Sequence, residues 1–287
     1  MELLKIVLPV DFSERSIGAA QHAKALACRF QSEVHVVNVV DLRVWGMYGF
    51  TNDETAADRF APGCKQYAEE KIEDYLDDEL SGVNVKRVLL YGDPAREIVK
   101  YAEAEKADLI VLPTHGFGPF RRFLLGSVTT KVLHDAHCPV WTGVHMEGPQ
   151  KAPSFGRILC AMDPWNGDFG GLEWAWRFGQ MAGAQVRIVH VLPGIYKPDS
   201  IYFEDDIRRS VISMAEEQIR QAQQQAGSNA QVEMLIGDAP AEVSRFAEEW
   251  NADLLVISRG VASAPLGRLR SRSYTFIRES PCPVVSV

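Results

Sequence analysis

Residues that could hold an anion follow an apolar run at 109–112. The run ends in the turn P-T-H-G-F-G (113–118), and a basic segment separates this turn from Gly126 and Ser127, where an amphipathic pattern begins. Glycine lets the backbone approach a ligand closely, and the N–H groups and dipole of a helix N-terminus favour negative charge. The stretch 108–138 therefore predicts a strand, a glycine turn and a helix that together bind a phosphate group.

The chain around this stretch alternates short apolar runs with helical patterns. Strands are expected at 3–10, 33–40, 84–92, 108–113 and 139–144, and helices in between include 65–81, 94–106 and 126–136. Ser13 is placed to cap the helix after the first strand. The irregular, aromatic-rich segment 42–64 is expected to be a long loop that packs over a site or moves when the site is filled. The alternation predicts an α/β fold with a parallel sheet.

The same order of motifs returns in the second half of the chain. R-I-L-C-A-M-D (157–163) matches K-I-V-L-P-V-D (5–11), and the stretch that begins with G-D at 237 matches the one that begins with G-D at 92. Asp11 and Asn38 are 27 residues apart, as are Asp163 and His190. Residues 145–157 lack apolar periodicity and are expected to link the halves. The predicted domains are 1–146 and 155–287, two copies of one fold.

These motifs resemble those of a tandem universal stress protein, with two UspA-like domains in one chain. The family signature is Gly, two residues, Gly, nine residues and Gly-Ser. Gly116, Gly126 and Ser127 match it, and Pro113 stands at the first glycine. P-x-D at 9–11, G-D-P at 92–94 and C-P-V at 138–140 are further landmarks. The resemblance implies two Rossmann-like domains, each a five-stranded parallel sheet with helices on both faces, paired as a pseudo-two-fold dimer.

The resemblance also implies that ATP, with or without Mg²⁺, binds at the strand ends of the first domain. Asp11 corresponds to the residue that contacts adenosine, and Val39 to the backbone that reads the adenine edge. The expected site residues, from the resemblance and from their places at strand ends, are Pro9, Asp11, Val39, Thr114, His115, Gly116, Gly126, Ser127, Val128 and Thr129. In the second half Arg270 replaces the glycine of the cradle, which predicts a degenerate site.

Several of these residues also have simpler interpretations. Asp11 is also suited to cap a helix, and His115 to line a site without acting as an acid or base. H-D-A-H-C at 134–138 holds metal-ligating residue types, but no carboxylate pair converges on it, so no metal site is expected. Without a visible triad or general-base pair, an efficient enzyme is not expected, and slow ATP hydrolysis stays open. The alternative is a stress-response scaffold that binds no nucleotide because Pro113 removes a donor.

Composition limits the class of protein further. The 287 residues are 46% hydrophobic and 24% charged, with a formal net charge of −8, which argues against a nucleic-acid partner. No apolar run approaches the roughly 18 residues of a membrane helix. Five cysteines without C-x-x-C spacing are expected to be reduced and mostly buried. We therefore expect a cytoplasmic stress-response signalling protein without membrane association. Its protein partners are unknown, and homodimerisation is left open.

Overall fold

The computed structural model describes residues 2–41, 54–114, 125–146, 153–196, 205–259 and 271–287. The chain forms two compact units. One consists mainly of Glu2–Thr142, and the other of Pro153–Val287 together with Gly143–His145. Both units are α/β, as the sequence predicts. The domain limits 1–146 and 155–287 and the pairing of the two domains stay predictions.

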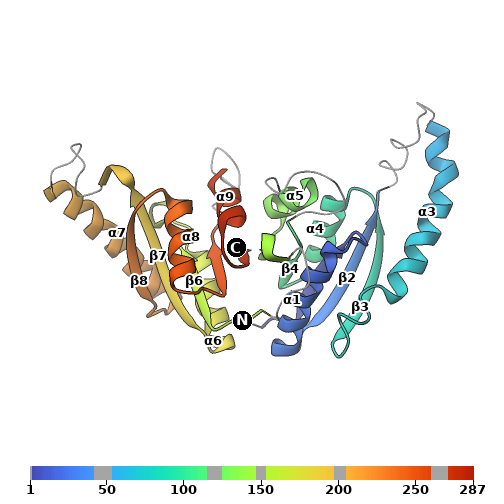
Figure 1. Ribbon diagram of the computed structural model, residues 1–287, viewed down its shortest axis with the longest axis horizontal. Coiled ribbons are helices and arrows are strands. Elements are labelled where there is room, and N and C mark those ends of the chain that lie inside the picture. Colours follow the sequence, from blue (N-terminus) through green and yellow to red (C-terminus); the bar gives the residue numbers. More distant parts are fainter. Residues whose placement is uncertain (1, 42–53, 115–124, 147–152, 197–204, 260–270) are drawn as a thin grey trace. The chain divides into compact units, whose positions relative to one another are not determined.

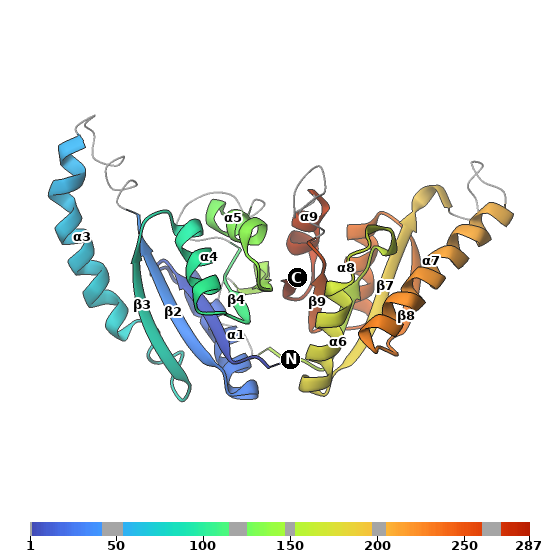
Figure 2. The ribbon, with the colours of Figure 1, turned by 180° about the vertical axis from the view of Figure 1, so that it is seen from behind.

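The first unit holds a parallel sheet in the order β3-β2-β1-β4-β5. Right-handed crossovers place the first two helices on one face of this sheet and the last two on the other, as Figures 1 and 2 show from opposite sides. The elements are β1 (Lys5–Val10), α1 (Arg15–Phe30), β2 (Glu33–Val40), α3 (Glu54–Asp74), β3 (Asn84–Tyr91), α4 (Pro94–Ala104), β4 (Leu109–Val111), α5 (Ser127–Asp135) and β5 (Val140–Thr142), followed by the 3-10 helix η1 (Val144–Met146).

The second unit repeats this plan with the sheet order β10-β9-β6-β7-β8, again parallel. Its elements are β6 (Arg157–Ala161), η2 (Pro164–Asn166), α6 (Gly170–Ala182), β7 (Gln185–Pro193), η3 (Gly194–Tyr196), α7 (Asp205–Ala226), β8 (Gln231–Gly237), α8 (Ala239–Glu249), β9 (Leu254–Ile257), α9 (Ser271–Glu279) and β10 (Val284–Ser286). Equivalent strands occupy equivalent places, so the two halves are copies of one Rossmann-like fold.

The core of each unit surrounds its central strand. Val7 and Leu8 in β1, and Ile158 and Leu159 in β6, have no exposed surface. Successive side chains of a strand point to opposite faces, so these strands are covered on both sides by helices. This burial explains why the strands are continuous apolar runs in the sequence rather than alternating patterns.

The predicted cap of the first helix is wrong. α1 begins at Arg15 after Glu14, and no side chain among the described residues caps it. The Ser13 Oγ atom is buried and has no hydrogen-bond partner in the described part of the chain. The backbone turns at Phe12, whose φ is 61°, before the helix begins. This turn rather than a serine cap joins β1 to α1.

The segment 42–64 is not a loop throughout. α3 begins at Glu54, inside that segment, and ends at Asp74 rather than at residue 81. Pro62 lies within the helix, where proline removes a backbone hydrogen bond and clashes with the preceding turn. Pro62 and the neighbouring Gly63 therefore form a sequence pattern that is typical of a helix break. Residues 42–53 lie outside the described residues.

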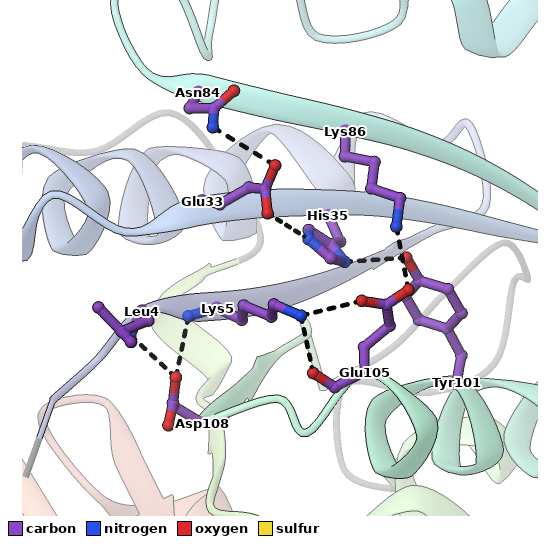
Figure 3. A network of polar contacts seen from close by, with 9 residues as sticks. All are labelled: Leu4, Lys5, Glu33, His35, Asn84, Lys86, Tyr101, Glu105 and Asp108. Atoms are coloured by element: carbon purple, nitrogen blue, oxygen red, sulfur yellow. Dashed lines mark hydrogen bonds and ion pairs between the residues drawn. The ribbon is translucent and has the colours of Figure 1, made fainter.

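Asp108 is predicted to stabilise the first unit by joining the start of β1 to β4. Its Oδ2 accepts hydrogen bonds of 2.9 Å from the amides of Leu4 and Lys5 (Figure 3). Because hydrogen bonds to a charged group contribute about 1.5–3 kcal/mol, Asp108→Ala should lower the free energy of unfolding by about 2 kcal/mol. Urea unfolding measures this loss. An unchanged unfolding curve would contradict it.

The second unit offers a matched variant. Asp253 Oδ2 accepts hydrogen bonds of 2.8 Å from the amides of Gly156 and Arg157, in the place that Asp108 has in the first unit. Asp253→Ala should therefore lower the free energy of unfolding by a similar amount. The change should appear only in the unfolding transition of the second unit.

Candidate functional site

The expected ligand edge of the first unit lies where the strand order reverses. The chain runs from β1 outward through β2 to β3, and then returns to β4 on the other side of β1. In open α/β sheets, ligands bind outside the carboxyl ends of the strands at this switch point. Asp11 follows β1 there and is exposed, while Thr114 follows β4 and is fully buried.

The start of α5 is fixed to the end of β4. The Gly126 amide donates a hydrogen bond of 2.8 Å to the Thr114 carbonyl, and Thr129 Oγ1 donates one of 3.0 Å to the Pro113 carbonyl. Helical bonding in α5 begins with Thr130 N to Gly126 O at 2.8 Å. The amides of the first turn have no acceptor within the helix, and no described side chain caps it. This first turn can therefore offer donors and a helix dipole to an anion.

The backbone conformation of Gly126 does not require glycine. Its φ of −59° and ψ of 149° lie in a region open to any L-residue. Gly126 is partly exposed and Ser127 is exposed. The backbone conformation therefore does not account for glycine at this helix start, whereas close approach of a ligand to the backbone would account for it.

The other expected site residues are spread along the same edge. Pro9 is buried in β1, whereas Val39 is partly exposed near the end of β2. Val128 is partly exposed on α5, whereas Thr129 is buried and its hydroxyl donates to the Pro113 carbonyl after β4. His115 and Gly116 lie outside the described residues. The topology thus gathers the ends of β1, β2 and β4 with the start of α5.

Asp11 shapes the turn that follows β1. Its Oδ1 accepts hydrogen bonds from Ser13 N at 3.1 Å and from Ser16 Oγ at 3.4 Å. The Asp11 carboxylate therefore stabilises the turn and is also exposed. A cap-like role and a ligand role of Asp11 do not exclude each other. Tyr67 and Tyr75, whose rings meet Phe12 at this turn, were not among the predicted site residues.

The equivalent edge of the second unit is built differently. Asp163 Oδ1 accepts a hydrogen bond of 3.2 Å from Trp165 N, and the 3-10 helix η2 begins at Pro164, in the place of Phe12. Proline fixes φ near −65°, so it cannot form the turn that Phe12 makes. Arg259 follows β9 and is only 5% exposed. Gly260 and Arg270 lie outside the described residues.

His190 occupies the place that Asn38 has in the first unit. Asn38 Nδ2 donates to the Val10 carbonyl at 2.8 Å, and His190 Nδ1 donates to the Met162 carbonyl at 2.9 Å. In the described part of the chain, His190 Nε2 is buried without a hydrogen-bond partner. Burial lowers the pKa of His190 below 6.5, against smaller opposite effects of the Met162 carbonyl and Asp163. The imidazole is therefore neutral in the folded protein at pH 7.

This burial predicts that the second unit is less stable in acid. The unfolded chain takes up the His190 proton at a higher pH than the folded chain, so stability is full above about pH 6.5 and falls as the pH drops toward the lowered pKa. Urea unfolding at pH 7, 6 and 5 measures this fall. His190→Asn copies Asn38 and should flatten that pH dependence; equal slopes for the variant and the original protein would refute the assignment.

A separate polar network lies at the opposite edge, where the strands begin (Figure 3). Glu105 lies 3.0 Å from both Lys86 Nζ and Lys5 Nζ, and these two lysines lower its pKa to about 2. The fully buried His35 donates from Nε2 to Glu33 at 2.9 Å and accepts from the Tyr101 hydroxyl at 2.8 Å. The network joins α4 to three strands, away from the carboxyl ends where ligands bind. We assign it a structural role.

The described residues hold no group of three or more metal-ligating side chains. The prediction that the cysteines are mostly buried is confirmed for only two of those described. Burial raises the pKa of the Cys160 and Cys282 thiols to about 12, whereas Cys138 is partly exposed and Cys28 is exposed. No described helix is long and apolar enough to span a bilayer.

Comparisons with known proteins agree with the repeated architecture. A sequence model of the universal stress protein family matches residues 3–142 and again residues 154–287. A universal stress protein of Methanocaldococcus jannaschii, MJ0531, is 38% identical over 136 residues, which cover 47% of this chain and 79% of the relative. A second one, MJ0577, is 32% identical over 148 residues, which cover 47% of this chain and 91% of the relative.

A solved structure resembles the whole chain. The crystal structure of a universal stress protein from Archaeoglobus fulgidus aligns with a TM-score of 0.65 at 23% identity, covering 99% of this chain and 96% of that one. At this identity the likeness concerns the fold alone.

Proposed function

The chain belongs to the universal stress protein family, with two copies of the family domain, and we propose that its first domain binds ATP as a signal in a stress response. One observation carries this proposal: Gly126 directly precedes α5 in a backbone conformation that does not need glycine, beside an uncapped first turn. A triphosphate bound there would meet the backbone N–H groups of the residues from Ser127 to Thr129 and the positive end of the helix dipole.

The remaining assignments follow from position. We assign the adenosine to Asp11 and Val39, which lie at neighbouring strand ends, and include Thr114, His115 and Gly116 in the proposed site because they follow β4 in the sequence. Mg²⁺, if it accompanies ATP, would be held largely by the phosphates. The domain acts by binding rather than by catalysis, in a cytoplasmic protein that has protein partners and pairs its two domains with each other.

The second domain is proposed to bind no nucleotide. Arg270 stands in the sequence where the cradle needs Gly126. Pro164 replaces the turn residue after Asp163, and Arg259 is buried at the end of β9. Arg270 and Pro164 thus replace Gly126 and Phe12 of the first domain.

A scaffold that binds no nucleotide is the second candidate, and Pro113 favours it. Proline lacks the amide that glycine would offer at this position. One experiment separates the two candidates: the purified protein is denatured, released adenine nucleotide is sought by chromatography, and refolded or nucleotide-free protein is titrated with ATP. Released nucleotide or saturable binding supports the first candidate. No binding at millimolar ATP rejects it in favour of the scaffold.

A further inference from the structure

The turn after Asp11 places an aromatic residue in an unusual conformation. Phe12 has a φ of 61°, a left-handed conformation that bulky residues rarely adopt. Such outliers persist only when the surrounding structure holds them, and they gather at functional sites. The position of this one, directly after the exposed Asp11 at the expected ligand edge, calls for a reason beyond chain reversal.

Tyr75 holds the turn from the side of α3. Its hydroxyl donates a hydrogen bond of 2.9 Å to the Ser13 carbonyl, and its ring meets Phe12 edge to face at 5.0 Å between centroids. Burial raises the pKa of Tyr75, and the charge of Asp11 raises it further, against a hydrogen bond from Ser16, so the hydroxyl stays protonated as a donor. The Phe12 ring is thus fixed by contacts on one side.

Tyr67 lies against Phe12 as well. The two rings are 6.3 Å apart between centroids and nearly perpendicular, at 88°. Unlike Tyr75, Tyr67 is 56% exposed, although it carries a large apolar ring. A half-exposed aromatic ring backed by a fixed second ring offers a flat surface to a ligand.

These rings lie at the edge of the sheet that would receive the base. Phe12 follows β1, and β2 lies between β1 and β3, with Val10 beside Asn38 and Val40 beside Tyr91. Val39, near the end of β2, is the residue whose backbone would read the base edge in the proposed function. α3, which carries Tyr67, contacts both β2 and β3, and Tyr67 meets the residue that follows β1. The two rings thus connect the end of β1 with the helix that packs on the strand of Val39.

We propose that Tyr67, backed edge-on by Phe12, forms a stacking wall for the purine base of the bound nucleotide. The inference rests on the proposed function and adds to it the residue that favours a purine. Stacking on an aromatic side chain tolerates any base but gains with ring area, so it favours adenine over cytosine. In the described part of the second domain, Pro164 stands in the place of Phe12 and cannot make its turn, so the backing ring is missing there.

Calorimetric titration of the full chain tests the inference with ATP, CTP and inorganic tripolyphosphate. Tyr67→Ala should weaken ATP binding about tenfold, which corresponds to about 1.4 kcal/mol, and should weaken CTP binding less. Tripolyphosphate, which has no base, should bind equally to the variant and the original protein. Tyr67→Phe keeps the ring and should restore ATP binding. Trp165→Ala removes an exposed aromatic residue (50%) from the same edge of the second domain and should change nothing.

Each outcome decides a different claim. Loss of ATP affinity in Tyr67→Ala with rescue by Tyr67→Phe supports the stacking wall. Equal ATP affinity of Tyr67→Ala and the original protein overturns the wall and leaves the proposed function standing. No ATP binding by the original protein overturns the proposed function, and the wall with it. Since Tyr67 is largely exposed, a thermal unfolding midpoint unchanged by Tyr67→Ala shows that the loss is not caused by unfolding.

Discussion

Replacing Gly126 with arginine is expected to weaken ATP binding by at least about 100-fold, or about 2.7 kcal/mol, while the first domain stays folded. The substitution copies Arg270 of the second half into the first. A side chain at this helix start would occupy the space through which phosphate reaches the first-turn amides. The fold should tolerate the change, because the φ of −59° and ψ of 149° suit any L-residue.

The controls for this prediction use the same position and its counterpart. Gly126→Ala adds only a methyl group and should weaken ATP binding less than arginine does. Arg270→Gly should not create a second site, because Pro164 and the buried Arg259 remain. Isothermal titration calorimetry measures all three affinities, and circular dichroism follows the fold. Normal ATP binding by a folded Gly126→Arg variant would place the phosphate elsewhere.

Phe178→Ala is expected to lower the free energy of unfolding of the second domain by about 3–5 kcal/mol, the range for removing a fully buried aromatic side chain. Phe178 has no exposed surface. Its ring stacks on Trp174 at 4.8 Å and meets Phe155 edge-on at 5.9 Å. Alanine would leave a cavity and would remove both ring contacts. ATP affinity should stay unchanged, because the proposed site lies in the other domain.

Leu26 is the counterpart of Phe178 in the first domain and is also fully buried. Leu26→Ala should lower the stability of that domain by about 2–5 kcal/mol. ATP at about 100 times its dissociation constant should restore about 2.7 kcal/mol of this loss and none of the loss in Phe178→Ala. Urea unfolding with and without ATP measures both effects. Equal rescue of the two variants, or rescue of neither, would contradict a site confined to the first domain.

The strands were predictable because each is an apolar run with clear ends, although β3 and β8 are only partly buried. The predicted strand at 33–40 is β2, and the predicted strand at 84–92 is β3 with one residue fewer at its end. Pro94 opens α4, where the sequence predicted a helix to begin, and Asp93 caps this helix by accepting a hydrogen bond from Arg96 N. The internal repeat supported these assignments, because each element is predicted from two copies of the same sequence pattern.

Other features depended on contacts that no local pattern reveals. α3 continues through Pro62, where the local sequence signals a break. The turn at Phe12 is held by Tyr75, which is 63 residues further along the chain, so the Ser13 cap was a reasonable local prediction and still wrong. The ties from Gly126 to Thr114 and from Thr129 to Pro113 likewise join residues that only the folded chain brings together.

The most direct test of the central claim is the number of ATP molecules bound by each chain, measured by isothermal titration calorimetry on nucleotide-free protein. One intact cradle in the first domain and a degenerate edge in the second predict a stoichiometry of one, which Gly126→Arg abolishes. A stoichiometry of two would show that the second domain also binds, in spite of Arg270 and Pro164. A titration without heat or saturation at millimolar ATP would show that neither domain binds.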